Sequence, residues 1–134
     1  MNDYIGKYGL LGYLPKNGLE KHVHPDDVEK LQSCWGTIKM CRAIDSDDVY
    51  LHLFNGENHF RVTPQLFQVM EAQPKFNFGD MVREKHDLGR EGTIHYVCWH
   101  YERMKVYYLL KIKGKESNRW NFDEDLQLIS EKKL

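Results

Sequence analysis

Hydrophobic and polar residues alternate along much of this chain, and that alternation predicts a protein built mainly of β-strands. The pattern is clearest between residues 49 and 54, where Val49, Leu51 and Leu53 alternate with Tyr50, His52 and Phe54. It continues at Phe60 and Val62. An earlier strand is expected to run from Ile38 and Met40 to Ala43 and Ile44. The first half therefore predicts a meander of short strands.

Turn residues divide this meander. Asn55-Gly56 is a strong hairpin signal between the second and third strands. Pro64 ends the third strand, and we expect a single helical turn over "PQLF" before a last short strand over "QVM".

One helix interrupts the β pattern. In "HPDDVEKLQSCW", Pro25 suits a first helical turn, and Asp26, Asp27 and Glu29 are acids where the helix dipole favours them. Val28 and Leu31 give a short apolar stripe, so a helix is predicted over about residues 25–33. Residues 1–21, rich in Gly and Tyr and broken by Pro15, predict an irregular segment that lies across the protein, with Tyr13 and Leu14 among its apolar contacts.

The second half predicts the same plan. "EAQPK" (residues 71–75) is a polar linker containing Pro74, which separates a first region, 1–70, from a second, 76–134. Strands are expected at "FGDMVRE", "TIHYVCWHY" and "VYYLLKIKG", with turns at "KHDLGREG", "ERMK" and "KESN". "RWNF", one helical turn at "DEDL" and the strand "QLIS" complete it. Gly36-Thr37-Ile38 matches Gly92-Thr93-Ile94 and Leu66 matches Leu126, so an internal repeat is one interpretation and chance similarity the other.

The segment "FGDMVRE…GREGTIHYV…YYLLKI…RW…DEDLQLI" resembles the SH3-like barrels, in particular their KOW and Tudor-like branches. The resemblance covers residues 76–130. It implies a fold class that is mainly β with a minor helix, as one or two SH3-like barrels packed in a compact unit. It implies no single function, because this barrel carries unrelated activities.

The whole chain also resembles an uncharacterised family of small bacterial proteins. The shared features are Tyr8-Gly9-Leu10, "HPDD" at 24–27, the segment from Phe60 to Phe67, and the second-half pattern above. This resemblance implies a bacterial or phage origin and brings no activity with it.

Composition narrows the classes of function. The net charge is −1, and residues 1–74 hold seven Lys and Arg against ten Asp and Glu, whereas residues 75–134 hold twelve against ten. Such a balance argues against non-specific nucleic-acid binding. Three cysteines without CxxC spacing argue against a disulfide framework or zinc ribbon. The start has no signal-peptide pattern and no segment reaches the length of a membrane span, so a cytoplasmic, non-membrane protein is expected.

Candidate chemistry is sparse. His22 and His24, followed by two acids, could ligate zinc or manganese, but His24 and the acids also suit a helix start. Cys98 lies near two histidines, yet nothing in the sequence supplies an orienting third group. We therefore expect no catalytic residues, no cofactor and no metal, with a metal-dependent enzyme as a third hypothesis.

Two surfaces of the second half are candidates for binding. Aromatic residues gather at a hairpin, and Trp99 or Tyr101, together with Tyr107, is expected to be part of an exposed patch. The alternative is that these rings fill the core of a small barrel. Lys111, Lys113 and Lys115 would share one strand face, with Arg119 nearby, and could follow phosphates or simply protect a strand edge. The preferred hypothesis is a non-enzymatic protein-interaction module whose partner is another protein; an immunity or anti-defence role would fit its size and charge. The alternative is an RNA- or ribosome-associated KOW-like module. The sequence sets no oligomeric state.

Overall fold

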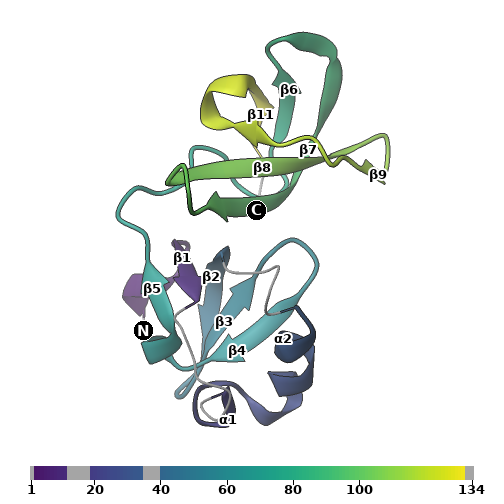
Figure 1. Cartoon of the computed structure of the whole chain (residues 1–134). Helices are drawn as coiled ribbons and strands as arrows, with labels where there is room; N and C mark the ends of the chain where they lie inside the picture. The colour runs from purple at the N-terminus through teal and green to yellow at the C-terminus, as the bar shows by residue number, and fades with distance from the viewer. Residues whose placement is uncertain (1, 12–18, 35–39, 132–134) are drawn as a thin grey trace. The chain divides into compact units, whose positions relative to one another are not determined.

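A computed structural model describes residues 2–11, 19–34 and 40–131. The chain divides into two compact units, an N-terminal unit of residues 1–73 and a C-terminal unit of residues 74–134. Each unit is built on one antiparallel sheet, so the protein is mainly β, as the alternation predicted (Figure 1). The expected residues Tyr13, Leu14, Pro15 and the Gly36–Ile38 segment lie outside the described residues.

The N-terminal sheet has the order β4-β3-β2-β1-β5. Its strands are β1 (Tyr8–Leu11), β2 (Met40–Ser46), β3 (Leu51–Phe54), β4 (His59–Val62) and β5 (Phe67–Val69). The alternation predicted here is confirmed for Leu51, Leu53, Phe60 and Val62, which are fully buried in one core. It fails at Val49, which is 55% exposed and precedes β3. Gly56 takes a positive φ in the predicted β3–β4 hairpin, and a 3₁₀ turn at Pro64–Leu66 precedes β5 as expected.

The predicted helix is present in two parts. A 3₁₀ turn at Pro25–Asp27 leads into α2 (Val28–Cys34), and Leu31 packs in the core beside the sheet. The side chain of His24 caps the turn by accepting a hydrogen bond from the backbone N–H of Asp26. A shorter helix, α1 (Leu19–His22), comes just before it.

The expectation of an irregular N-terminal segment is wrong for residues 8–11. They form β1, an interior strand of the sheet that pairs with β2 on one side and β5 on the other. The reason is crowding at Gly9, where a Cβ atom would lie 2.5 Å from the carbonyl oxygen of Gln68. Because only glycine fits there, β1 lacks the alternation that identifies the other strands.

The C-terminal sheet has the order β10-β8-β7-β6-β11, with the short β9 also paired to β8. Its strands are β6 (Met81–Glu84), β7 (Asp87–His100), β8 (Lys105–Ile112), β9 (Lys115–Glu116), β10 (Asn121–Phe122) and β11 (Leu126–Ser130). A 3₁₀ turn at Asp123–Asp125 precedes β11, as predicted. Side chains buried in this unit include Phe76, Val82, Ile94, Tyr108, Leu110 and Leu126.

Two predicted turns are placed differently. Most of the expected turn "KHDLGREG" belongs to β7, which already begins at Asp87. The turn expected at "KESN" comes earlier, at Lys113-Gly114, where both residues have positive φ. Two consecutive left-handed residues make the tight hairpin turn that matches strand twist, so β8 reverses at once into β9.

The two sheets share their register as well as their strand order. In the N-terminal unit, the pair Ala43–Leu53 is followed by a one-residue bulge in β2. In the C-terminal unit, the pair Ile94–Leu110 is followed by a one-residue bulge in β7. Both last strands follow a 3₁₀ turn and pair with the first strand of their unit. By this register Ile94 corresponds to Ala43 and Leu126 to Phe67, so the two sequence matches that suggested a repeat, Ile94 with Ile38 and Leu126 with Leu66, do not join equivalent positions. In the described residues the two end strands of each sheet do not pair with one another, so both sheets stay open and a closed barrel is not shown.

Candidate functional site

Four aromatic rings form a cluster on one face of the C-terminal sheet. Tyr107 and Trp120 are stacked with ring centroids 4.7 Å apart and planes inclined by 25°. His100 meets both rings edge-on, at 5.4 Å from Trp120 and 6.2 Å from Tyr107. Phe122 lies 6.4 Å from Tyr107 and from His100. We call His100, Tyr107, Trp120 and Phe122 the aromatic cluster.

Strand register explains why these rings meet. Tyr107 of β8 lies opposite Cys98 of β7 and opposite Phe122 of β10. His100 and Trp120 are each two residues from one of these partners, and residues two apart in a strand share a face. The cluster therefore covers the face of the sheet opposite to the one that buries Tyr108, whose side chain is fully inaccessible.

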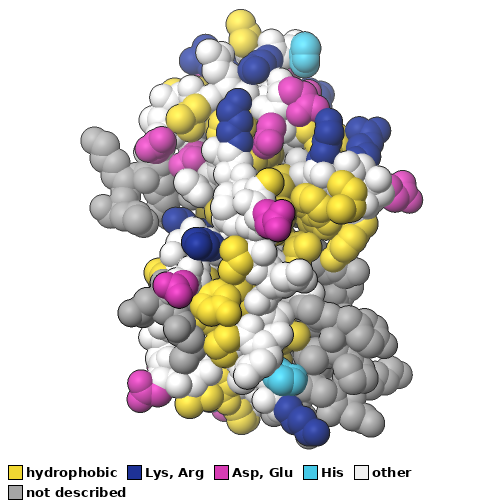
Figure 2. Space-filling view, turned by 90° about the vertical axis from the view of Figure 1, so that its left-hand side faces the viewer, with side chains coloured by type: hydrophobic (Ala, Val, Ile, Leu, Met, Phe, Trp, Pro, Cys, Tyr) yellow, Lys and Arg dark blue, Asp and Glu magenta, His cyan; other side chains and the backbone are white. Residues whose placement is uncertain are grey.

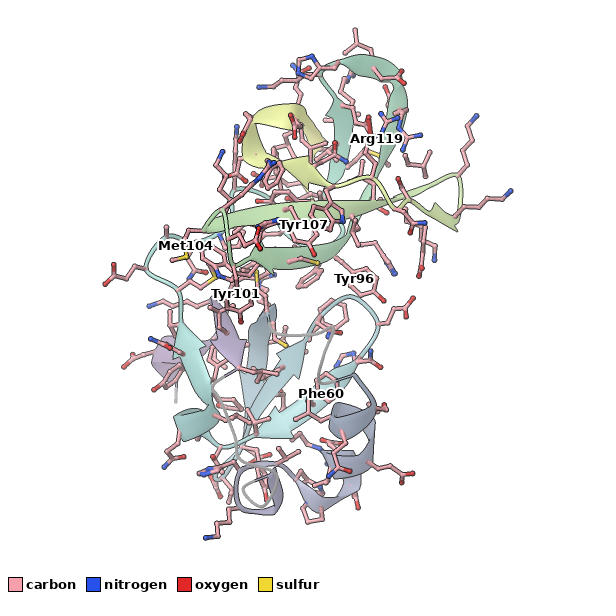
Figure 3. All side chains as sticks on the ribbon, in the orientation of Figure 1. Phe60, Tyr96, Tyr101, Met104, Tyr107 and Arg119 are labelled. Carbon is pink, nitrogen blue, oxygen red and sulfur yellow. The ribbon has the colours of Figure 1, made fainter. Side chains whose placement is uncertain are left out.

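Trp120 is the exposed member of the cluster. It keeps 53% of its surface accessible, although its ring is stacked on Tyr107. Tyr101 and Met104, at the turn between β7 and β8, are also exposed, and both lie at the end of this hairpin in Figure 3. In the upper half of Figure 2, which holds the C-terminal unit, hydrophobic side chains gather on the surface between basic and acidic ones. A large exposed ring supported by other rings is typical of a binding surface.

Two cations and one acid lie beside the cluster. The guanidinium of Arg103 and the ammonium of Lys105 lie 5.3 and 5.6 Å from the centre of the Phe122 ring. Lys105 also forms a 3.0 Å ion pair with Glu124. The backbone N–H and Lys105 beside Glu124 lower the pKa of that carboxyl, so it stays ionised at neutral pH. The charge of Lys105 is thus matched by Glu124, and Arg103 adds a positive charge beside Phe122.

The structure separates the three aromatic residues that the sequence grouped. Tyr107 belongs to the aromatic cluster, whereas Trp99 pairs with Val106 and lies on the opposite face of β7. Tyr101 is in the turn beyond β7 and is half exposed. A strand alternates its faces, so adjacent positions such as 98 and 99 cannot share a surface.

The predicted lysine row does not form. Lys111 is in β8 opposite Glu116, Lys113 is in the turn with positive φ, and Lys115 is in β9 opposite Ile112. Lys111 and Lys115 therefore face opposite sides of the hairpin. Arg119 donates a 2.6 Å hydrogen bond to the buried carboxylate of Glu84, which also receives one from Arg90. These four side chains give no continuous track for phosphates.

The two candidate metal ligands do not converge. His22 Nδ1 lies 2.9 Å from the hydroxyl of Thr63. His24 Nδ1 accepts the hydrogen bond from Asp26 N–H, and its ring packs 5.2 Å from that of Tyr50. The buried carboxylate of Asp27, which would be the natural third ligand, is held by Arg61 through both oxygens.

Cys98 is beneath the cluster and is a poor nucleophile. Burial raises the pKa of its thiol to about 11, although a hydrogen bond from Tyr107 lowers it somewhat. Burial also raises the pKa of Tyr107 to about 12. Reactive cysteines have lowered pKa values, so this thiol does not fit covalent catalysis.

Three members of the cluster were not predicted as site residues: His100, Trp120 and Phe122. A signal was present, because Trp120 and Phe122 are two apart and would share a face in a strand. What the sequence could not supply was the register that puts β10 beside β8.

Comparison with known proteins places the chain in a family but not in a function. No curated protein and no solved structure matches it. In the described parts of the chain, no helix has the length and apolar character needed to cross a bilayer. The model of a family of unknown function, DUF6960, matches residues 1–127, nearly the whole sequence. The chain belongs to this uncharacterised family.

Proposed function

We propose that the protein is a non-enzymatic protein-interaction module that binds its partner through the aromatic cluster of the C-terminal unit. The observation that carries this proposal is Trp120, half exposed yet held in place by stacking on Tyr107. A rigid exposed ring loses little conformational entropy when it is covered, which is why Trp and Tyr dominate the energetics of protein interfaces.

The charges support a protein partner over RNA. Nucleic-acid surfaces need basic groups that are free to contact phosphates. Here Lys105 is paired with Glu124, Arg119 is paired with Glu84, and Lys111 lies opposite Glu116. A surface with exposed rings and mostly paired cations suits a protein, and an RNA- or ribosome-associated module remains the alternative that the experiment tests.

The test is affinity capture from the host with four forms of the full chain, each with and without nuclease. They are the wild type, Trp120→Ala with His100→Ala, Lys111→Glu with Lys113→Glu, and Leu88→Ala. Leu88 is the control, because it is an exposed apolar residue of β7 outside the cluster. We expect one protein to be captured by the wild type, the lysine variant and the control, and to be lost with the aromatic variant.

Nuclease should change nothing in this experiment. Capture that disappears with nuclease and with the lysine variant would favour RNA. Capture that survives loss of both rings would show that the aromatic cluster is not the docking surface.

The proposal includes an origin and a fold relationship. The 3₁₀ turn before the last strand is a feature of the segment that resembles the SH3-like barrels, and both sheets have it; their shared strand order and register support an internal repeat. We propose two SH3-like copies in a bacterial, cytoplasmic protein. Free thiols at Cys41 and Cys98 are consistent with a reducing compartment. A structure of each unit determined by NMR would test the repeat.

A further inference from the structure

Arg61 in the N-terminal unit and Trp120 in the C-terminal unit hold the same position in their sheets. Counting from the bulges, Leu53 corresponds to Leu110. Two residues earlier, Leu51 corresponds to Tyr108. Leu51 pairs with Val62 of β4, and Tyr108 pairs with Asn121 of β10. The residues that precede Val62 and Asn121 are Arg61 and Trp120. Tyr50 and Tyr107 correspond by the same count.

In the N-terminal unit the chain itself covers this position. The backbone C=O of Arg61 accepts a 2.8 Å hydrogen bond from His24 N–H, and its N–H donates at 2.9 Å to Asp27. The Asp27 carboxylate also accepts from Nε of Arg61 at 2.8 Å. The ring of His24 lies against Tyr50. The segment His24–Asp27 therefore satisfies the outer backbone hydrogen-bonding groups of Arg61 and neutralises its guanidinium.

In the C-terminal unit the corresponding position is uncovered. Trp120 is 53% exposed, and in the described part of the chain neither its backbone N–H nor its C=O has a hydrogen-bond partner. Two residues after Trp120, the backbone N–H of Phe122 donates a hydrogen bond to the carboxylate of Asp125, so this outer N–H is already satisfied. The open place is thus limited to Trp120 and the rings beside it.

We propose that this place receives a peptide segment of a partner protein, bound on Trp120 as His24–Asp27 is bound on Arg61. The segment donates one backbone N–H to the C=O of Trp120 and accepts from its N–H. Because a tryptophan replaces the arginine, the side chain placed on it is apolar or aromatic rather than acidic. The segment needs no acid opposite Lys105, since this neighbouring cation is already paired with Glu124. This inference rests on the proposed function and specifies how the partner is recognised.

The test uses a displayed library of random 12-residue peptides selected against the full chain, with Trp120→Ala as the counter-target. We expect selected peptides that contain an apolar or aromatic residue and lack acidic clusters. Their binding to Trp120→Ala should be about 30-fold weaker, the effect of losing an anchor of ~2 kcal/mol. Trp120→Phe, which keeps a ring, should retain most of the binding, and Leu88→Ala all of it.

Two further measurements locate the peptide. Bound peptide should shift the backbone amides of Trp120 and Asn121 in ¹⁵N–¹H spectra and leave those of Arg61 and Thr63 unchanged. Methylation of the one peptide nitrogen that pairs with Trp120 should weaken binding about tenfold, as expected for a lost backbone hydrogen bond.

The inference is overturned if no peptide is enriched over the counter-target, if the selected peptides are acidic, or if they shift the Arg61 region instead. A selected peptide should also compete with the host partner for the full chain. If the partner needs Trp120 but the peptide does not compete, the proposed function stands and the peptide-segment inference fails. If the partner is indifferent to Trp120, the proposed function itself fails.

Discussion

Arg119 donates a 2.6 Å hydrogen bond to Glu84, a carboxylate whose side chain is only 4% exposed. Arg90 donates a second, at 2.9 Å, and also bonds the hydroxyl of Ser117. One buried acid in β6 thus joins the start of β7 to the segment that leads into β10. The residue that looks in sequence like a phosphate contact is part of the scaffold of the C-terminal unit.

The first prediction concerns Glu84 and pH. Burial alone would raise the pKa of Glu84, but the hydrogen bonds from Arg90 and Arg119 outweigh it and lower that pKa below its usual 4.5. Its contribution to stability is therefore complete above about pH 4.5 and is lost as the pH falls through the lower, folded-state pKa. Glu84→Gln should lower the free energy of unfolding at pH 7 by on the order of 2 kcal/mol. Urea midpoints from pH 7 to pH 3 should show this difference shrinking with acid; a constant difference would contradict the ionic role.

The second prediction concerns two crowded glycines. A Cβ at Gly9 would lie 2.5 Å from Gln68 O, and one at Gly92 would lie 2.5 Å from Lys111 O. Backbone atoms cannot move aside cheaply, so Gly9→Ala and Gly92→Val should each cost on the order of 1–3 kcal/mol. Gly89→Ala is the matched control, because its nearest atom would be 3.7 Å away. The melting temperatures of the three variants test this prediction. A Gly92→Val variant that melts like the wild type would show that the close approach of Lys111 O is not the reason for glycine at position 92.

Local signals predicted the fold well where one face of a strand is buried. The hairpin at Asn55-Gly56 and the 3₁₀ turns before β5 and β11 were all predicted from turn residues and alternation. β1 was not predicted, because the glycine at position 9 is required by close contact with Gln68, 59 positions later. Such crowding between strands leaves no periodic pattern in the sequence. The turn at Lys113-Gly114 was missed because a lysine with positive φ looks, in sequence, like one more strand residue.

The candidate site was predicted only in part, for a related reason. Tyr107 was identified, but its partner His100 is in β7 and its partner Trp120 comes just before β10, and only the pairing of β8 with β7 and β10 brings them together. Trp99 was grouped with Tyr107 because both are aromatic and close in sequence. The faces of a sheet depend on register, which a list of nearby aromatic residues does not contain.

The third prediction concerns Cys98. With a pKa of about 11, only about one thiol in a thousand is ionised at pH 8. Alkylation of Cys98 by iodoacetamide in the native protein should be on the order of 100-fold slower than in urea at the same pH. Peptide mapping separates it from Cys34 and Cys41. Labelling at the unfolded rate would show an accessible, ionisable thiol and would reopen the covalent hypothesis.

The fourth prediction concerns the buried hydroxyl of Tyr108. It donates a 2.7 Å hydrogen bond to Asp123 and lies 3.1 and 3.3 Å from the backbone N–H groups of Lys75 and Phe76, which donate to it. Burial and the bond to Asp123 raise the pKa of Tyr108, so it should not titrate while the protein is folded. Tyr108→Phe keeps the ring but leaves these hydrogen-bond partners unpaired, which should lower the free energy of unfolding by on the order of 1–3 kcal/mol. Tyr50→Phe is the matched control, because its ring contact with His24 survives the change and it should stay within about 0.5 kcal/mol of the wild type. Chemical unfolding of both variants measures the difference, and equal stabilities would mean that water replaces the lost hydroxyl and that the start of the C-terminal unit does not depend on Tyr108.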